Sequence, residues 1–325
     1  MDPVRIGIMG CADIARRRML PAMAAVPGAE AVAVASRDPD TAADLAARVG
    51  CRPVHGYARL LELDEIEAVY IPLPAALHAT WVEAALRAGK HVLAEKPVTA
   101  EPERSRALLD LARRYDLALM ENIMFVHHRQ HAAVRRLLDE GAIGELRSFH
   151  AAFAIPALPD SDIRYARELG GGALGDVGIY PVRAALHFLG TALSVAGAVL
   201  ADGPGREVDT LGAALLRGPG GCSAHLTFGL DHAYQSSYVL WGSTGRITVS
   251  RAFTPPADYA PVLSLESETG ARQILLEPDD QVANTVRAFI SAVRAGRSPA
   301  ADVTLRQAEI LHEIRRLAGA PATLN

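Results

Sequence analysis

A lysine at the end of a short apolar segment is the first candidate for chemistry in this sequence. Residues 90–98 read KHVLAEKPV, which predicts a buried strand over His91–Ala94 followed by Glu95 and Lys96. Open α/β sheets bind ligands at the carboxyl ends of their strands. Pro97 biases Lys96 toward an extended conformation, and X-Pro bonds are the peptide bonds that readily become cis. Lys96 could therefore be aimed at a ligand, although a solvated loop lysine has the same local pattern.

The second candidate is the segment GDVGIYP, residues 175–181, at the start of a predicted helix. Asp176 and Tyr180 are four residues apart, so a regular helix places them on one face. A tyrosine, with a usual pKa of ~10, becomes a better acid when a lysine cation stabilises its phenolate. We predict that Lys96, Tyr180 and Asp176 are catalytic, and that Lys96 and Tyr180 supply the proton that accompanies hydride transfer to a ketone. An N-capping aspartate and a buried tyrosine are the alternative.

A glycine turn after the first apolar segment is a candidate phosphate site. Val4–Met9 predicts a strand, and a helical pattern follows the turn. Backbone N–H groups and the positive end of a helix dipole can bind a pyrophosphate at such a turn, although a plain strand-to-helix turn is the alternative. Ala12 occupies the second glycine position of G-x-G-x-x-G/A, so the match is imperfect. The predicted cofactor contacts in this turn are Gly10, Cys11, Ala12, Asp13 and Ile14.

The next predicted strand ends at Ser36 and Arg37, where an NAD enzyme carries an acidic residue for the ribose hydroxyl. A guanidinium pairs with phosphate oxygens, whereas an aspartate repels them. These two residues therefore favour NADP(H) as the cofactor. The alternative is that Arg37 only occupies a surface loop.

The pattern of elements predicts two domains. Strands alternate with helices up to about residue 122, which predicts an α/β, Rossmann-type domain with a doubly wound parallel sheet over residues 1–122. The remainder, 123–325, predicts an α+β domain for substrate binding and oligomerisation, with an open, mostly antiparallel sheet. An open sheet face without covering helices needs a partner, so we expect a homo-oligomer, a dimer or tetramer, through this sheet.

Composition excludes several other classes. With a net charge of −4 and a pI near 6.3, the 325-residue chain has no basic excess, so neither a nucleic acid nor a membrane is an expected partner. Neither a signal peptide nor a long apolar span is visible, and we expect a cytoplasmic protein. Cys11, Cys51 and Cys222 lack a CxxC spacing. His127 and His131 lack an HExxH context, so no metal site is predicted.

Three motifs together resemble one oxidoreductase family. Gly10–Ala15, Ala94–Pro97 and Gly175–Tyr180 are similar to the glucose-fructose oxidoreductase/inositol dehydrogenase (Gfo/Idh/MocA) family, and the match spans nearly the whole chain. The resemblance implies that Lys96 lies beside the nicotinamide. In that family the peptide bond to the following proline is often cis, so the same is expected of the bond to Pro97. The resemblance also implies that the open sheet mediates oligomerisation.

Further motifs resemble the NADP-dependent C-3 ketoreductases of dTDP-deoxysugar biosynthesis, enzymes of antibiotic pathways. This resemblance implies reduction of the C-3 keto group of a nucleotide-linked sugar. Sugar dehydrogenases of the family commonly carry a histidine where Tyr180 stands and an aspartate where Arg183 stands. A neutral tyrosine is suited to donate a proton, which favours reduction. The motifs are Val69–Pro74, His127-His128, Asp162–Tyr165, Ser243–Arg246 and Phe253–Pro256.

The resemblance also implies positions for the remaining site residues. Ser36 and Arg37 would bind the 2′-phosphate. The other predicted cofactor contacts are Tyr57, Leu73, Pro74, His78, Glu95 and Arg164. The predicted substrate contacts are His127, Tyr165 and Tyr234. The ring of Tyr234 could stack on a thymine.

Two other functions stay open at this point. The same scaffold supports an NADP-dependent dehydrogenase of a free sugar or a dihydrodiol. A regulator that binds NADP without turnover is the non-enzymatic alternative, which the presence of Lys96 and Tyr180 disfavours because a sensor needs no proton donor.

Overall fold

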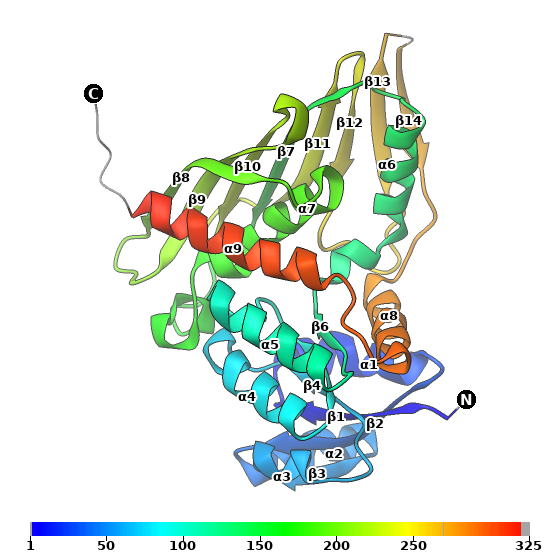
Figure 1. Cartoon of the computed structure of the whole chain (residues 1–325), viewed down its shortest axis with the longest axis vertical. Helices are drawn as coiled ribbons and strands as arrows, with labels where there is room; N and C mark the ends of the chain where they lie inside the picture. The colour runs from blue at the N-terminus through cyan, green and yellow to red at the C-terminus, as the bar shows by residue number, and fades with distance from the viewer. Residues whose placement is uncertain (1, 269, 320–325) are drawn as a thin grey trace. The chain divides into compact units, whose positions relative to one another are not determined.

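The computed structural model describes residues 2–268 and 270–319, which divide into two compact units (Figure 1). The first unit takes Met1–Ile123 and Val282–Leu305, and the second takes Met124–Gln281 and Arg306–Asn325. Each unit is thus built from two stretches of chain, whereas the sequence pattern predicts one boundary after residue 122.

The first unit contains a six-stranded sheet in the order β3-β2-β1-β4-β5-β6, in which all neighbouring strands are parallel. This is the doubly wound order of a Rossmann fold, so the predicted fold class is confirmed. The order reverses between β1 and β4, and sheets of this type bind ligands at that reversal, beyond the carboxyl ends of the strands. The strands are β1 (Val4–Met9), β2 (Ala29–Ser36), β3 (Arg52–His55), β4 (Ala68–Ile71), β5 (His91–Ala94) and β6 (Leu119–Glu121).

Helices connect these strands largely where the sequence pattern predicts them. Helix α4 begins at Ala75, because Pro72 and Pro74 end the preceding extended segment and the chain turns directly into the helix. The first helix begins with a π-helical turn, Ala15–Met19. The helices of this unit are α1 (Leu20–Ala25), α2 (Pro39–Val49), α3 (Tyr57–Leu61), α4 (Ala75–Arg87), α5 (Pro102–Arg114) and most of α8 (Gln281–Ala295).

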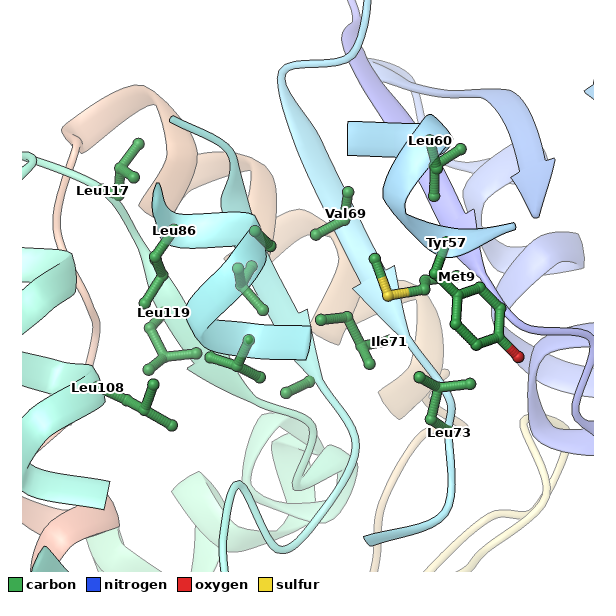
Figure 2. Close-up of a cluster of buried hydrophobic side chains, with 14 of the residues drawn as sticks. Met9, Tyr57, Leu60, Val69, Ile71, Leu73, Leu86, Leu108, Leu117 and Leu119 are labelled. Atoms are coloured by element: carbon green, nitrogen blue, oxygen red, sulfur yellow. The ribbon is translucent and has the colours of Figure 1, made fainter. Parts of the chain in front are cut away.

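The core of the first unit surrounds the middle strands of the parallel sheet. Figure 2 shows Val69 and Ile71 of β4 near the centre of the cluster, with Leu86 of α4 and Leu108 of α5 at one end and Met9 of β1 at the other. All five side chains are buried. Burial of each such side chain contributes roughly 1.5–3 kcal/mol, so this core fixes the strand ends that carry the candidate site.

The second unit contains an eight-stranded sheet in the order β14-β13-β12-β11-β7-β10-β9-β8. Neighbouring strands are antiparallel except for β7 and β10, which are parallel, so the predicted mostly antiparallel sheet is confirmed. The strands are β7 (Leu146–Ala154), β8 (Ser194–Asp202), β9 (Asp209–Arg217), β10 (Ser223–Gly229), β11 (Gln235–Gly242), β12 (Gly245–Ser250), β13 (Val262–Ser267) and β14 (Gly270–Leu275).

The two faces of this sheet differ. Helices α6 (Arg129–Asp139) and α7 (Ile179–Leu189) pack on one face: His131 is hydrogen-bonded to Tyr238 of β11, and the ring of Phe188 lies 5.0 Å from that of Tyr238 (Figure 1). The opposite face exposes apolar side chains, including Val199 (62% exposed) and Trp241 (57%). The last helix, α9 (Ala301–Ala318), begins in the stretch assigned to the first unit and ends in the second. Among the described helices, none is both long and apolar enough to cross a lipid bilayer.

Candidate active site

The carboxyl ends of the parallel strands bring together residues that were predicted to bind the cofactor. Gly10 follows β1, Ser36 ends β2, Leu73 follows β4, and Glu95 follows β5. The structure thus places four segments, distant in sequence, along the sheet edge at which ligands of doubly wound folds bind.

The turn after β1 requires glycine at its first position. Gly10 has a φ of +118°, and its backbone N–H donates to Ala35 O over 2.9 Å. A Cβ at this position would lie 2.9 Å from Leu73 Cδ2, which is too close. Ala12 in the same turn is accommodated, so the departure from the glycine motif at that position leaves the turn intact.

Cys11, Asp13 and Ile14 are the other predicted cofactor contacts of this turn. Asp13 pairs with Arg16, whose hydrogen bond and charge lower the pKa of the Asp13 carboxyl. Cys11 lies 3.7 Å from Thr41 O, and burial raises the pKa of the Cys11 thiol, which keeps it protonated and unreactive. Ile14 stands directly before the π-helical turn Ala15–Met19. π-Helical turns are rare overall, and those that do occur are often found at functional sites.

An exposed guanidinium follows β2, as the preference for NADP requires. His55 Nε2 donates to Arg37 O over 3.1 Å, which fixes the backbone. Burial raises the pKa of Tyr57, while the charge and hydrogen bond of the Arg37 side chain act in the opposite direction. The carboxylate of Asp38 caps α2, where it accepts from Thr41 Oγ1 (2.7 Å) and Asp40 N (3.1 Å). Ser36 Oγ accepts from Asp38 N (3.2 Å). Arg37 therefore presents positive charge at this corner, and the carboxylate of the adjacent Asp38 is used as a cap.

Two side-chain donors orient Glu95. Tyr70 Oη and Asn122 Nδ2 each donate to Glu95 Oε1 over 2.6 Å. Burial and then the charge of Glu95 raise the pKa of Tyr70, so Tyr70 remains a neutral donor. The carboxylate that precedes Lys96 is thus held between β4 and the segment after β6.

The turn that carries Lys96 is held by a buried histidine. The Lys96–Pro97 peptide bond is cis. His78 of α4 has Nδ1 2.7 Å from Pro97 O and Nε2 2.7 Å from Leu73 O. Carbonyl oxygens only accept, so a ring nitrogen that carries a hydrogen donates to the carbonyl that it faces. His78 thereby links the Lys96 turn to the Leu73–Pro74 turn.

Lysine is an unusual choice in this chain. Lys90 and Lys96 are the two lysines among 33 lysine and arginine residues. Lys90 Nζ is a structural donor, since it bonds Leu63 O at 2.9 Å and Ile66 O at 2.8 Å. An ammonium group can lose a proton, whereas a guanidinium cannot in proteins. With Lys90 engaged as a structural donor, Lys96 is the lysine that lies at the carboxyl end of β5, and its ammonium group is chemically able to serve in proton transfer.

Asp176 lies in the second unit, in a π-helical turn, Leu174–Gly178, that precedes α7. The sequence predicts a regular helix at this point, whereas the structure has a π turn, in which the backbone hydrogen bonds span five residues rather than four. Arg164 Nε donates to Asp176 Oδ2 over 2.7 Å, and Arg164 Nη1 donates to Asp162 Oδ1 over 3.1 Å. Burial alone would lower the pKa of Arg164, but the two carboxylates raise it. Arg164 therefore stays charged and positions Asp176.

Tyr180 is positioned by aromatic packing within the second unit. Its ring centroid lies 4.8 Å from that of Phe153 and 5.9 Å from those of Phe125 and Phe253. Phe125, Phe153 and Phe253 are all buried. The orientation of the Tyr180 ring is therefore set by neighbours on three different segments.

Two histidines of the second unit, His127 and His187, have lowered pKa values. Burial, followed by the charge of Arg183, lowers the pKa of His127 to about 4. The pKa of His187 also falls to about 4, through burial and then the charges of Arg135 and Arg183. Neither histidine is charged near neutral pH.

The histidines before and within α6 have structural roles. His128 Nδ1 accepts from Gln130 N and caps α6. His131 is fully buried. Within the described ranges, 2–268 and 270–319, no group of three histidine, cysteine or acidic residues could hold a metal ion.

The two tyrosines predicted to contact substrate differ in exposure. Tyr165 is buried: its hydroxyl donates to Asp231 and accepts from Leu158 N, and the guanidinium of Arg206 lies 3.8 Å from its ring centroid. Tyr234 is 40% exposed, and its hydroxyl lies 2.7 Å from Thr254 Oγ1. Tyr234 is therefore the better placed of the two to meet a ligand.

Comparison with known proteins supplies the family. Residues 4–123 match the profile described as "Oxidoreductase family, NAD-binding Rossmann fold", and residues 131–248 match the "GFO/IDH/MocA C-terminal domain". The chain is 51% identical over 316 residues to a dTDP-3,4-didehydro-2,6-dideoxy-alpha-D-glucose 3-reductase of Actinomadura kijaniata, covering 97% of this chain and 95% of that protein. It is 54% identical over 294 residues to the reductase of the same name from Saccharopolyspora spinosa, covering 90% and 89%.

A solved structure is similar over the same extent. The crystal structure of a 3-ketoreductase from Actinomadura kijaniata in complex with NADP and TDP-benzene matches with a TM-score of 0.94 and 51% identity. The match covers 97% of this chain and 98% of that one.

Proposed function

Because the chain belongs to the Gfo/Idh/MocA oxidoreductase family, we propose that it is an NADPH-dependent reductase of the C-3 keto group of a dTDP-linked keto-deoxysugar. The observation that carries this proposal is the identity of half or more, over nine-tenths or more of the chain, to two reductases of that substrate class. The solved ketoreductase binds NADP and a TDP derivative, which are the cofactor and nucleotide proposed for this chain.

The residues of the first unit fit NADPH. The positive φ of Gly10 opens the turn after β1, and the exposed Arg37 follows β2. When bound, the cofactor supplies hydride from C4 of its nicotinamide. We assign the accompanying proton to Tyr180 or Lys96, with the Lys96 cation stabilising the negative charge that develops on oxygen. Arg164 would hold Asp176 in the orientation that this chemistry needs.

A direct assay tests the reaction. Purified protein is mixed with NADPH and a dTDP-linked 3-keto-deoxysugar, and both NADPH absorbance and the mass of the sugar nucleotide are followed. The expected result is NADPH consumption coupled to a product that carries two more hydrogens. Turnover of free sugars or dihydrodiols but not of this substrate would support the dehydrogenase alternative. NADP binding without turnover of any of them would support the regulator.

Arg37→Ala tests the 2′-phosphate contact. We expect the preference for NADPH over NADH to narrow by ~1.5–3 kcal/mol, because one charge-assisted hydrogen-bonded contact to the phosphate is lost. The measurement is the ratio of kcat/KM for the two cofactors. Arg48→Ala, which removes an exposed arginine from α2, is the control and should leave the ratio unchanged. Equal losses with NADPH and NADH in Arg37→Ala would refute the assignment.

The exposed sheet face is the proposed surface for a second copy of the chain, in a dimer or tetramer. Val199, Leu211, Leu215 and Trp241 are all exposed there, and exposed apolar side chains on one face of a sheet are typical of an isologous interface. Leu215→Glu should weaken association at least about tenfold, because it would bury an unpaired charge. Sedimentation velocity over a dilution series measures this. Ala43→Glu on the exposed side of α2 is the control, and an unaltered assembly in Leu215→Glu would contradict this surface.

The cytoplasm is the proposed compartment. Cys11, Cys51 and Cys222 are all free thiols, as is typical of proteins kept in a reducing environment.

A further inference from the structure

A short segment after β12, residues 251–254, is held in place by hydrogen bonds to other parts of the second unit. Ala252 N donates to Ser236 O (2.9 Å), and Ala252 O accepts from Gln130 Nε2 (3.2 Å). Phe253 N donates to Ser236 Oγ (3.0 Å), and Phe253 O accepts from Gln281 Nε2 (3.3 Å). Every backbone polar group of these two residues therefore has a partner, and the residues on either side are anchored.

The same segment supports the proposed proton donor. The ring of Phe253 is buried and packs against the rings of Tyr180 (5.9 Å) and Phe153 (5.4 Å). On the other side of Phe253, Thr254 Oγ1 lies 2.7 Å from the hydroxyl of Tyr234. One rigid piece of chain thus connects Tyr180 with an exposed tyrosine.

Arg251 begins this segment in an unusual backbone conformation. Its φ is +49°, which is uncommon for a residue with a Cβ and costs energy, and such residues cluster at ligand sites. Its side chain is exposed, and its guanidinium carbon lies 5.7 Å from the ring centroid of Tyr234 and 5.8 Å from that of Tyr259. Asp231 and Asp258 are close in sequence to these rings, yet in the described part of the chain no carboxylate oxygen lies within 4.0 Å of this guanidinium.

We propose that Arg251 binds the diphosphate of the nucleotide-linked substrate and that the exposed ring of Tyr234 stacks on its pyrimidine base. This inference rests on the proposed function and assigns the part of the substrate that does not react. A guanidinium forms bidentate, charge-assisted hydrogen bonds to phosphate oxygens, and a tyrosine ring stacks on a base. The two flanking rings limit the motion of the guanidinium, so less freedom is lost when the phosphates bind.

The experiment measures the binding of dTDP and of thymidine to the NADP-bound protein by calorimetry. Arg251→Gln should weaken dTDP binding about tenfold or more and change thymidine binding by less than about twofold, since thymidine has no phosphate. Arg246→Gln is the matched control, because Arg246 is an exposed arginine of β12 paired with Glu266. It should leave both affinities unchanged. Tyr234→Leu should weaken both ligands, since both carry the base.

Arg251→Gly separates a binding role from a folding role. Glycine adopts a φ of +49° without strain, so this variant should unfold at the wild-type temperature or above it and still lose the same dTDP affinity. Wild-type affinity for dTDP in Arg251→Gly would overturn the inference, and so would an equal loss for thymidine in Arg251→Gln. A wild-type protein that binds NADPH but not dTDP would instead overturn the proposed substrate, which is a separate result.

Discussion

Lys96→Ala is expected to lower kcat by at least about 100-fold, the usual scale for loss of an acid–base group, while the affinity for NADPH stays nearly unchanged. The turn around Lys96 is fixed by groups that the substitution leaves in place, since His78 contacts Pro97 O and Glu121 Oε1 accepts from Val98 N. The loss should therefore be chemical and not structural. Steady-state turnover and NADPH binding by fluorescence are the two measurements, and unchanged turnover would remove Lys96 from the mechanism.

Lys96→Arg distinguishes the two roles that Lys96 could have. Arginine keeps the positive charge but does not release a proton in proteins. If Lys96 acts as a cation beside the reacting oxygen, Arg should restore part of the activity lost in Lys96→Ala. If Lys96 is the immediate proton donor, the arginine variant should be as slow as the alanine variant.

Tyr180→Phe is expected to lower kcat by about 100-fold or more, because the hydroxyl is the proposed proton source. Phenylalanine preserves the ring packing against Phe125, Phe153 and Phe253, so the variant should unfold at close to the wild-type temperature. Tyr115→Phe, which alters an exposed tyrosine of the first unit, is the control and should retain full activity. Full activity in Tyr180→Phe would show that the proton comes from another group.

The pH dependence of kcat and a double variant provide two further tests of the proton donor. Burial lowers the pKa values of His127 and His187 to about 4, so both stay neutral from neutral to alkaline pH. Neither histidine should therefore contribute to a change of kcat in that range, and a fall that is present in the wild type but absent in Tyr180→Phe would be assigned to Tyr180. If both residues serve one proton transfer, Lys96→Ala/Tyr180→Phe should be little slower than the slower single variant. Multiplicative losses would indicate separate steps.

Local signals in the sequence account for the alternation of strands and helices in the first unit. The bounds of β1 and β5 agree with the predicted strands to the residue, because their apolar runs and the glycine and proline residues near their ends are local signals. The sequence also identified the segments ending in Ser36-Arg37 and Glu95-Lys96, since carboxyl ends of parallel strands share one edge of the sheet.

The way in which distant segments meet is visible in the folded chain and not in its local patterns. It assigns residues 282–305 to the first unit, where Leu119 N donates to Ser298 Oγ over 2.9 Å. It pairs β7 with β10 in parallel, forms a π turn at Asp176, and sets Arg251 in a left-handed conformation between two tyrosines. Local patterns depend on a few neighbouring residues. These features instead depend on packing between residues far apart in the chain, which overrides local preference and leaves no periodic trace in the sequence.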